Sequence, residues 1–122
     1  MGQLETDQDT TAGLLVLLVT TGSSEETHQI ASELLNQRKA ACVNIVPAVT
    51  SLFRWQGKVD SAQESLLIIK TEASLLSEIV ALVKQIHSYD VPEIIALPVV
   101  GGSQDYLEWV GKETGYRGRK QC

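Results

Sequence analysis

The sequence predicts an α+β sandwich in which two strand–helix–strand units are joined by a long hairpin, in the order β-α-β-β-α-β. Three observations predict it: aliphatic runs of strand length, two segments with apolar residues at helical spacing, and a turn signal near mid-chain. The chain has 122 residues, 43% hydrophobic and 20% charged, as expected of one soluble domain. No segment approaches the roughly 18 apolar residues that a membrane-spanning helix needs.

The first strand and helix lie before the hairpin. The apolar run Leu14–Val19 has strand length, and Ser23 and Glu26 follow it at the spacing of a helix capping box. The apolar residues that share one helical face after this cap are Ile30, Ala31, Leu34 and Leu35. We expect the helix to end near Arg38 and Lys39, because positive charges suit a helix C-terminus.

The hairpin is expected between residues 41 and 71. A β-rich run extends over 41–55 and is broken at Pro47, which cannot donate to a strand ladder and therefore predicts a bulge or bend. The turn falls at Gln56-Gly57-Lys58. The returning strand ends with four successive aliphatic residues, Leu66 to Ile69, before Lys70.

The second half repeats the pattern. Ser74 precedes a helical face made of Leu75, Ile79, Leu82, Val83 and Ile86. Pro92 and Glu93 then introduce the aliphatic strand 94–100, and a short terminal helix is expected over 103–110. Two such units joined by a hairpin give a ferredoxin-like sandwich with a long central hairpin, a short C-terminal helix and both larger helices on one sheet face.

That arrangement leaves the second face of the sheet without helices. The runs 66–69 and 94–100 are apolar on both alternating faces of their strands, so a monomer would expose much aliphatic surface. A protruding hairpin also has edges that can pair with a neighbour. We therefore predict a homo-oligomer, although these arguments leave the number of subunits open.

Charge and terminal composition limit the class of protein. Fifteen acidic and ten basic residues give a net charge of −5, the wrong sign for binding nucleic acid, and no membrane interaction is expected. Residues 1–11 contain no Lys or Arg, which argues against a secretory leader or transit peptide and favours a cytoplasmic protein. We divide the chain into a flexible tail over 1–13, one domain over 14–113 and a flexible tail over 114–122.

Few residues carry a recognisable chemical signal, and no nucleophile motif or phosphate loop is present. His28 is expected to be solvated, whereas His87 ends the second helix and has two interpretations. It stabilises the helix C-terminus, or it binds a divalent transition metal together with further donors such as Glu64, Asp90 or Glu93, from its own or another subunit. Cys42 is expected to be a small structural residue, and neither it nor Cys122 belongs to a disulfide framework.

All six aromatic residues lie from Phe53 onward. Lys70 follows four aliphatic residues, so we expect it to lie at the exit of its strand or to pair with a carboxylate. The residues that could line a cleft between subunits are Trp55, Glu64, Lys70, Tyr89, Tyr106 and Trp109. The alternative is that the aromatic members of this set pack a subunit interface.

Five segments together carry a family resemblance: AACVNIVP, SLFRWQGKV, LLIIKT, HSYDVPEIIALPV and DYLEWV. Over 14–110 the sequence closely resembles the CutA divalent-cation tolerance proteins. The resemblance implies a ferredoxin-like fold, a homotrimer with interlocking hairpins, and a role in tolerance of copper and other divalent metals. It implies no enzymatic activity.

The family's metal-ligand positions match this sequence only in part. Val19 stands where some bacterial members have cysteine, and Ile86 where they have the first of two adjacent histidines, so that His87 alone remains. The sequence therefore predicts a cytoplasmic homotrimer that binds copper(II) or another divalent transition metal through His87, with no other cofactor. The alternatives are a trimeric small-ligand or signalling module with clefts between subunits, and a purely structural trimer.

Overall fold

The computed structural model describes residues 13–114. Its four strands form one antiparallel sheet in the order β2-β3-β1-β4. The strands are β1 (Leu14–Thr21), β2 (Cys42–Trp55), β3 (Lys58–Glu72) and β4 (Ile94–Pro98). The helices are α2 (Ser24–Asn36), α3 (Leu76–Ile86), preceded by the 3₁₀ turn η1 (Ala73–Leu75), and α4 (Gln104–Glu113). This confirms the predicted β-α-β-β-α-β sandwich with a C-terminal helix.

The predicted tails lie outside the described residues, except for Gly13 and Thr114. The side chain of Thr114 is buried and donates a hydrogen bond of 2.7 Å to the Glu72 carboxylate, which fixes the end of α4 to the end of β3. The division of the chain into a domain and two flexible tails stays a prediction.

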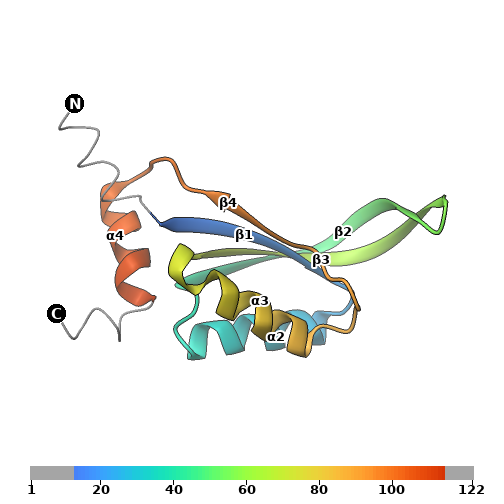
Figure 1. The fold of residues 1–122 in the computed structure, drawn as a ribbon, viewed down its shortest axis with the longest axis horizontal. Coiled ribbons are helices and arrows are strands. Elements are labelled where there is room, and N and C mark those ends of the chain that lie inside the picture. Colours follow the sequence, from blue (N-terminus) through green and yellow to red (C-terminus); the bar gives the residue numbers. More distant parts are fainter. Residues whose placement is uncertain (1–12, 115–122) are drawn as a thin grey trace.

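The helices α2 and α3 lie side by side on one face of the sheet, and the β2–β3 hairpin extends well beyond them (Figure 1). The helix α4 lies at the opposite end from the hairpin tip. Leu107 and Val110 of α4 pack there against Leu14, with Ala41 and Val99 at the margin. The sheet is thus covered by two helices on one face and by one helix at one end of the molecule.

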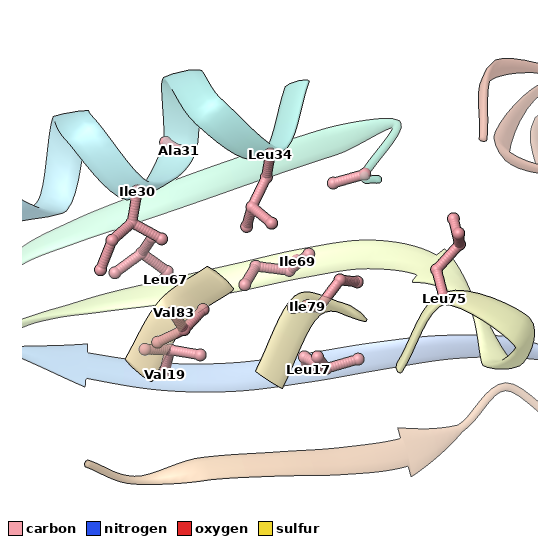
Figure 2. Packing of buried hydrophobic residues seen from close by; sticks show 11 residues of the cluster. Leu17, Val19, Ile30, Ala31, Leu34, Leu67, Ile69, Leu75, Ile79 and Val83 are labelled. Carbon is pink, nitrogen blue, oxygen red and sulfur yellow. The ribbon is translucent and has the colours of Figure 1, made fainter. Parts of the chain in front are cut away.

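The core lies between the sheet and the helices α2 and α3 (Figure 2). Its fully buried aliphatic residues alternate along the strands and recur at helical spacing in α2 and α3: Leu17, Val19, Ile30, Leu34, Leu67, Ile69, Ile79 and Val83. Each such side chain contributes roughly 1.5–3 kcal/mol through burial. The two predicted periodicities therefore meet in one aliphatic layer that contains no aromatic residue. Leu35, predicted on the same helical face as Leu34, is an exception, because it is 41% exposed.

The start of α2 follows its sequence signal, whereas α3 begins after a 3₁₀ turn that includes Ser74, and neither α3 nor α4 has a side-chain cap at its start. The side chain of Ser23 accepts a hydrogen bond of 3.2 Å from the Glu26 backbone N–H, which confirms the predicted cap of α2. The helix ends at Asn36, and Arg38 then adopts φ +57°. The helix α3 ends at Ile86, where His87 is extended and its N–H still donates to the Val83 carbonyl at 2.8 Å.

The hairpin shows both predicted irregularities. The pairing of β2 with β3 shifts between Val46 and Val49, beside Pro47, and Ala48 there has φ +61°. At the tip, Gln56 and Gly57 both have positive φ, at +52° and +79°, as a two-residue hairpin turn requires.

The second face of the sheet is open beside α4. Leu66 and Ile68 are only half-buried there, and Ile95 and Leu97 on β4 are 47% and 46% exposed. The face without helices is therefore as apolar as the sequence predicts. Within 13–114, no helix has the length and apolar character required to cross a membrane.

Candidate functional site

The end of β1, the start of α2 and the end of α3 meet at one edge of the sandwich. The chain leaves β1 at Thr21, turns at Gly22 and enters α2, while α3 ends at the same edge with His87. This meeting brings Glu26, from the first turn of α2, into contact with His87 and Ser88. The candidate site is built from elements that are far apart in the sequence.

His87 is buried at this edge, and its side chain has no exposed surface. The imidazole Nε2 lies 2.7 Å from the backbone carbonyl of Thr20. The imidazole Nδ1 accepts a hydrogen bond of 3.1 Å from the Tyr89 N–H and lies 3.1 Å from Oε2 of Glu26. Both ring nitrogens therefore have protein partners.

This hydrogen-bond pattern assigns the proton of the neutral ring. Because Nδ1 accepts from an amide, the proton of the neutral imidazole is on Nε2, which donates to the Thr20 carbonyl. The lone pair of the neutral ring is then on Nδ1, where it accepts from the Tyr89 N–H, with Oε2 of Glu26 3.1 Å away. Any ion bound by His87 in this orientation would use Nδ1.

Tyr89 lies at the same edge, between His87 and Glu64 of β3. Its hydroxyl donates a hydrogen bond of 2.9 Å to Oε2 of Glu64, and its ring centroid lies 4.7 Å from that of His87. A Cβ atom at Gly22 would lie 3.0 Å from the Tyr89 hydroxyl oxygen, so the absence of a side chain at Gly22 makes room for this contact. Burial, followed by the Glu64 hydrogen bond and the charges of Glu64 and Glu26, raises the pKa of Tyr89 above 10.0.

A second polar cluster lies on the open sheet face at the end near α4. The Lys70 ammonium donates to the side-chain oxygen of Asn44 and lies 3.9 Å from the thiol of Cys42, which occupies the directly opposite strand position. Cys42 is a free thiol that starts β2 and is half-buried, and its structural role stays a prediction. Within residues 13–114, Lys70 forms no ion pair with a carboxylate, and its ammonium is hydrogen-bonded to the side-chain amide of Asn44 instead.

The helix α4 adds two aromatic residues beside this cluster. The rings of Tyr106 and Trp109 have centroids 5.5 Å apart. Burial, followed by the proximity of Cys42 and a hydrogen bond with it, raises the pKa of Tyr106 above 10.0. The cluster thus combines a cation, an amide, a thiol and two aromatic rings.

One chain does not bring the six predicted cleft residues together. Glu64 and Tyr89 lie at one edge, whereas Lys70, Tyr106 and Trp109 lie near α4. Glu64 and Lys70 are six residues apart on β3, about 20 Å at the rise of a strand. Trp55 is at the exposed hairpin tip. A cleft that joins all six between subunits stays a prediction.

The predicted donors around His87 are also distributed differently. Asp90 and Glu93 are exposed, and Glu64 contacts Tyr89. Glu26, which the sequence marks only as part of a helix cap, lies beside His87 instead. The fold topology, and not the local sequence, predicts this contact. When both helices cover one face of the sheet, the start of α2 and the end of α3 lie at the same edge.

The metal-binding capacity of a single chain is limited. Among residues 13–114 there is no group of three or more His, Cys, Asp and Glu side chains that could hold an ion. The donor set at the pocket is one imidazole nitrogen and one carboxylate oxygen, both suitable for divalent transition metals. His28, the other histidine, is exposed and its Nδ1 lies 2.9 Å from the Ser24 carbonyl.

Comparison with known proteins decides the family. The model of the CutA1 divalent ion tolerance protein family matches residues 15–113. The chain belongs to this family. The CutA divalent-cation tolerance protein of Thermus thermophilus is 47% identical over 100 residues, which make up 82% of this chain and 97% of the relative. Protein CutA of Arabidopsis thaliana, a chloroplastic protein, is 48% identical over 100 residues, and the chain spans 55% of its length.

Solved CutA1 structures share the fold. The structure of the Thermus thermophilus protein has a TM-score of 0.82 at 46% identity, covering 84% of this chain and 99% of that one. The Oryza sativa CutA1 structure also has a TM-score of 0.82, at 47% identity, covering 86% and 96%. A CutA structure from Archaeoglobus fulgidus is described as periplasmic, so relatives occupy different compartments and the cytoplasmic location of this chain stays a prediction.

Proposed function

We propose that the protein is a non-catalytic homotrimer that acts in divalent-cation tolerance by binding copper(II) or another divalent transition metal. The family relationship supports the tolerance role. The observation that supports metal binding is the approach of the buried His87 Nδ1 to Oε2 of Glu26, at 3.1 Å. The net charge of −5 favours cations over anions near the molecule.

The spacing of these two atoms suits a shared ion. Two ligand atoms that each lie about 2.0–2.2 Å from a metal, at roughly a right angle, are about 3 Å apart. The Nδ1 of His87 and Oε2 of Glu26 lie 3.1 Å apart, and an ion on Nδ1 would have to replace the hydrogen bond from the Tyr89 N–H. Water or a residue of another subunit would complete the coordination, because one chain supplies two donors at this pocket.

The open sheet face supports the assembly. It carries half-buried and exposed aliphatic side chains on β3 and β4, including Ile95 and Leu97. A monomer would leave this surface in water at a cost of about 25 cal/mol for every Å² of apolar area. Covering the face with further copies of the chain removes that cost, and the family resemblance favours three copies.

Calorimetric titration with copper(II) tests the metal site. We expect binding heat with the wild type and with His28→Ala, and its loss with His87→Ala, because only the buried imidazole has a carboxylate at ligand spacing. Glu26→Gln should weaken binding while keeping the size of the side chain, which guards against misfolding of the His87 variant. Undiminished binding by His87→Ala and Glu26→Gln would contradict the assignment.

A second candidate function is the binding of a small anionic ligand in a cleft between subunits. Its support is Lys70, a half-buried ammonium whose partners among the described residues are the Asn44 amide and the Cys42 thiol. Native mass spectrometry of the protein purified from cell extract would detect such a ligand. Loss of that ligand from Lys70→Met, with retention in His87→Ala, would favour this function over metal binding.

A further inference from the structure

The helix α4 packs outside the main core of the sandwich. Of the described residues, those that build the main core lie in the sheet, in α2 and α3 and in the turns beside them, and none lies in α4. The buried hydrophobic residues of α4, Leu107 and Val110, instead form a separate small cluster with Leu14. Displacement of α4 would therefore leave the main core intact.

The segment that joins β4 to α4 opposes little movement. Residues 100–103 lie between the two elements and are exposed. A Cβ atom at Gly101 would meet no atom within 4 Å, and the φ angle of Gly101 is not positive. Neither the packing nor the backbone of this arrangement therefore requires a glycine at 101, whereas a hinge would use its conformational freedom.

The other end of α4 is held by Thr114. Its hydroxyl donates a hydrogen bond of 2.7 Å to Oε2 of Glu72, whose Oε1 accepts one of 2.9 Å from Ser74. Thr114 and Glu72 are both buried, and a hydrogen bond to a carboxylate is stronger than one between neutral groups. Arg38 donates to the Lys112 carbonyl at 3.0 Å, but this contact is exposed. We therefore expect the Thr114–Glu72 bond to matter most for holding α4 in place.

The helix α4 covers one end of the sheet, opposite the hairpin tip (Figure 1). Leu107 and Val110 cover Leu14, the first residue of β1. Tyr106 is hydrogen-bonded with Cys42, the first residue of β2. Movement of α4 would uncover both strand ends together.

We propose that α4 is a lid that opens as one unit while the sandwich stays folded. Gly101 serves as its hinge, and the Thr114–Glu72 hydrogen bond is the latch that keeps it closed. The open arrangement exposes Leu14 and separates Tyr106 from the Cys42 thiol. The inference does not depend on the proposed metal site.

Amide hydrogen exchange of the whole chain, resolved by NMR, tests the lid. When exchange reports the equilibrium population of open states, each amide gives the free energy of the opening that exposes it. The helix α3 is the internal reference, because Ile79 and Val83 place it in the main core. We expect the α4 amides from Leu107 onward to share one level of protection, at least about tenfold below that of the α3 amides.

Two variants act on the lid in opposite directions. Thr114→Val removes a hydrogen bond that exists only in the closed arrangement, so we expect exchange about tenfold faster or more in α4 and unchanged in α3. Gly101→Ala restricts the hinge and is compatible with the closed backbone. It should slow exchange in α4 by about two- to fivefold.

Thr27→Val is the matched control for the latch variant. Thr27 is a buried threonine of α2 whose hydroxyl donates to the Ser23 carbonyl at 2.8 Å. This variant destabilises the sandwich without touching α4. We expect faster exchange in the helices that cover the sheet and no change in α4.

The pattern of exchange separates a lid from the alternatives. A common protection of α4 below that of α3, with faster exchange confined to α4 in Thr114→Val and slower exchange in Gly101→Ala, supports the lid. Equal protection of both helices, or equal acceleration of both by Thr114→Val, overturns it, because α4 then opens only with the sandwich. Protection that declines residue by residue toward one end of α4 also overturns it, since it indicates fraying. If Thr114→Val does not fold, the wild type and Gly101→Ala still distinguish these results.

Discussion

The two faces of the sheet are built from alternate residues of the same strands but differ in burial. On β3, Leu67 and Ile69 are fully buried beneath α2 and α3, whereas Leu66 and Ile68 face the open side and stay half-buried. The helices α2 and α3 therefore cover one face of the sheet, whereas the apolar residues of the second face remain partly exposed. The covered face supplies the hydrophobic core of the chain, and the open face exposes apolar surface.

Polar chemistry follows the same division. The core beneath the covered face is aliphatic, with buried polar side chains at both ends of it: Thr71, which donates to the Lys39 carbonyl, at one end and His87 with Glu26 at the other. The open face carries Lys70 and Asn44 among apolar side chains. The difference between the two faces can therefore be tested by making the same substitution at a buried and at an exposed position and comparing the effects.

The largest effect is expected on the covered face. Leu34 is fully buried on α2, whereas its neighbour Leu35 is 41% exposed. We expect Leu34→Ala to lower the free energy of unfolding by about 2–5 kcal/mol and Leu35→Ala by less than about 1 kcal/mol. Guanidinium denaturation followed by circular dichroism measures both at equal protein concentration. Equal losses would contradict the one-sided core.

The next effect concerns the open face and changes assembly more than folding. Ile95→Asp places a charge on the exposed apolar surface of β4, so we expect sedimentation velocity to show smaller species with the circular dichroism spectrum retained. Val100→Asp is the control, because Val100 is 92% exposed in the connection between β4 and α4. If Ile95→Asp sediments as the wild type does, the open face is not the contact surface.

The smallest effect lies at the edge between the faces. The folded-state pKa of Tyr89 is raised, chiefly by burial and then by Glu64, so above pH 10 the unfolded chain loses this proton first. Its contribution to stability is complete below pH 10 and falls as the pH rises through the raised value. We expect Tyr89→Phe to lose less stability than the wild type between pH 9 and 11, measured by urea denaturation. If the free energies of unfolding of the wild type and Tyr89→Phe changed equally with pH, the Tyr89–Glu64 contact would not contribute to this pH dependence.

The sequence predicts the sandwich because its two periodicities are clean. Aliphatic runs separate from helical faces, and the cap at Ser23 and the bulge beside Pro47 both occur where their residue types require them. The hairpin turn at Gln56 and Gly57 likewise follows from local conformational preference.

The sequence does not predict the pocket, because its partners come from different elements. Glu26 has a sufficient local explanation in the first turn of α2, so nothing in its neighbourhood indicates His87. The sequence predicts that Lys70 pairs with a carboxylate or lies at the exit of its strand. The pairing of β2 with β3 instead brings its ammonium to Asn44 and Cys42. Contacts across the sheet depend on register, which periodicity alone does not fix.

We expect further copies of the chain to cover the open face, so that the assembly is a trimer. Light scattering coupled to size exclusion, performed on the full chain over a range of concentrations, tests it most directly. We expect a mass of about three times 13.3 kDa that persists on dilution. A stable, soluble species with the mass of one chain would contradict it.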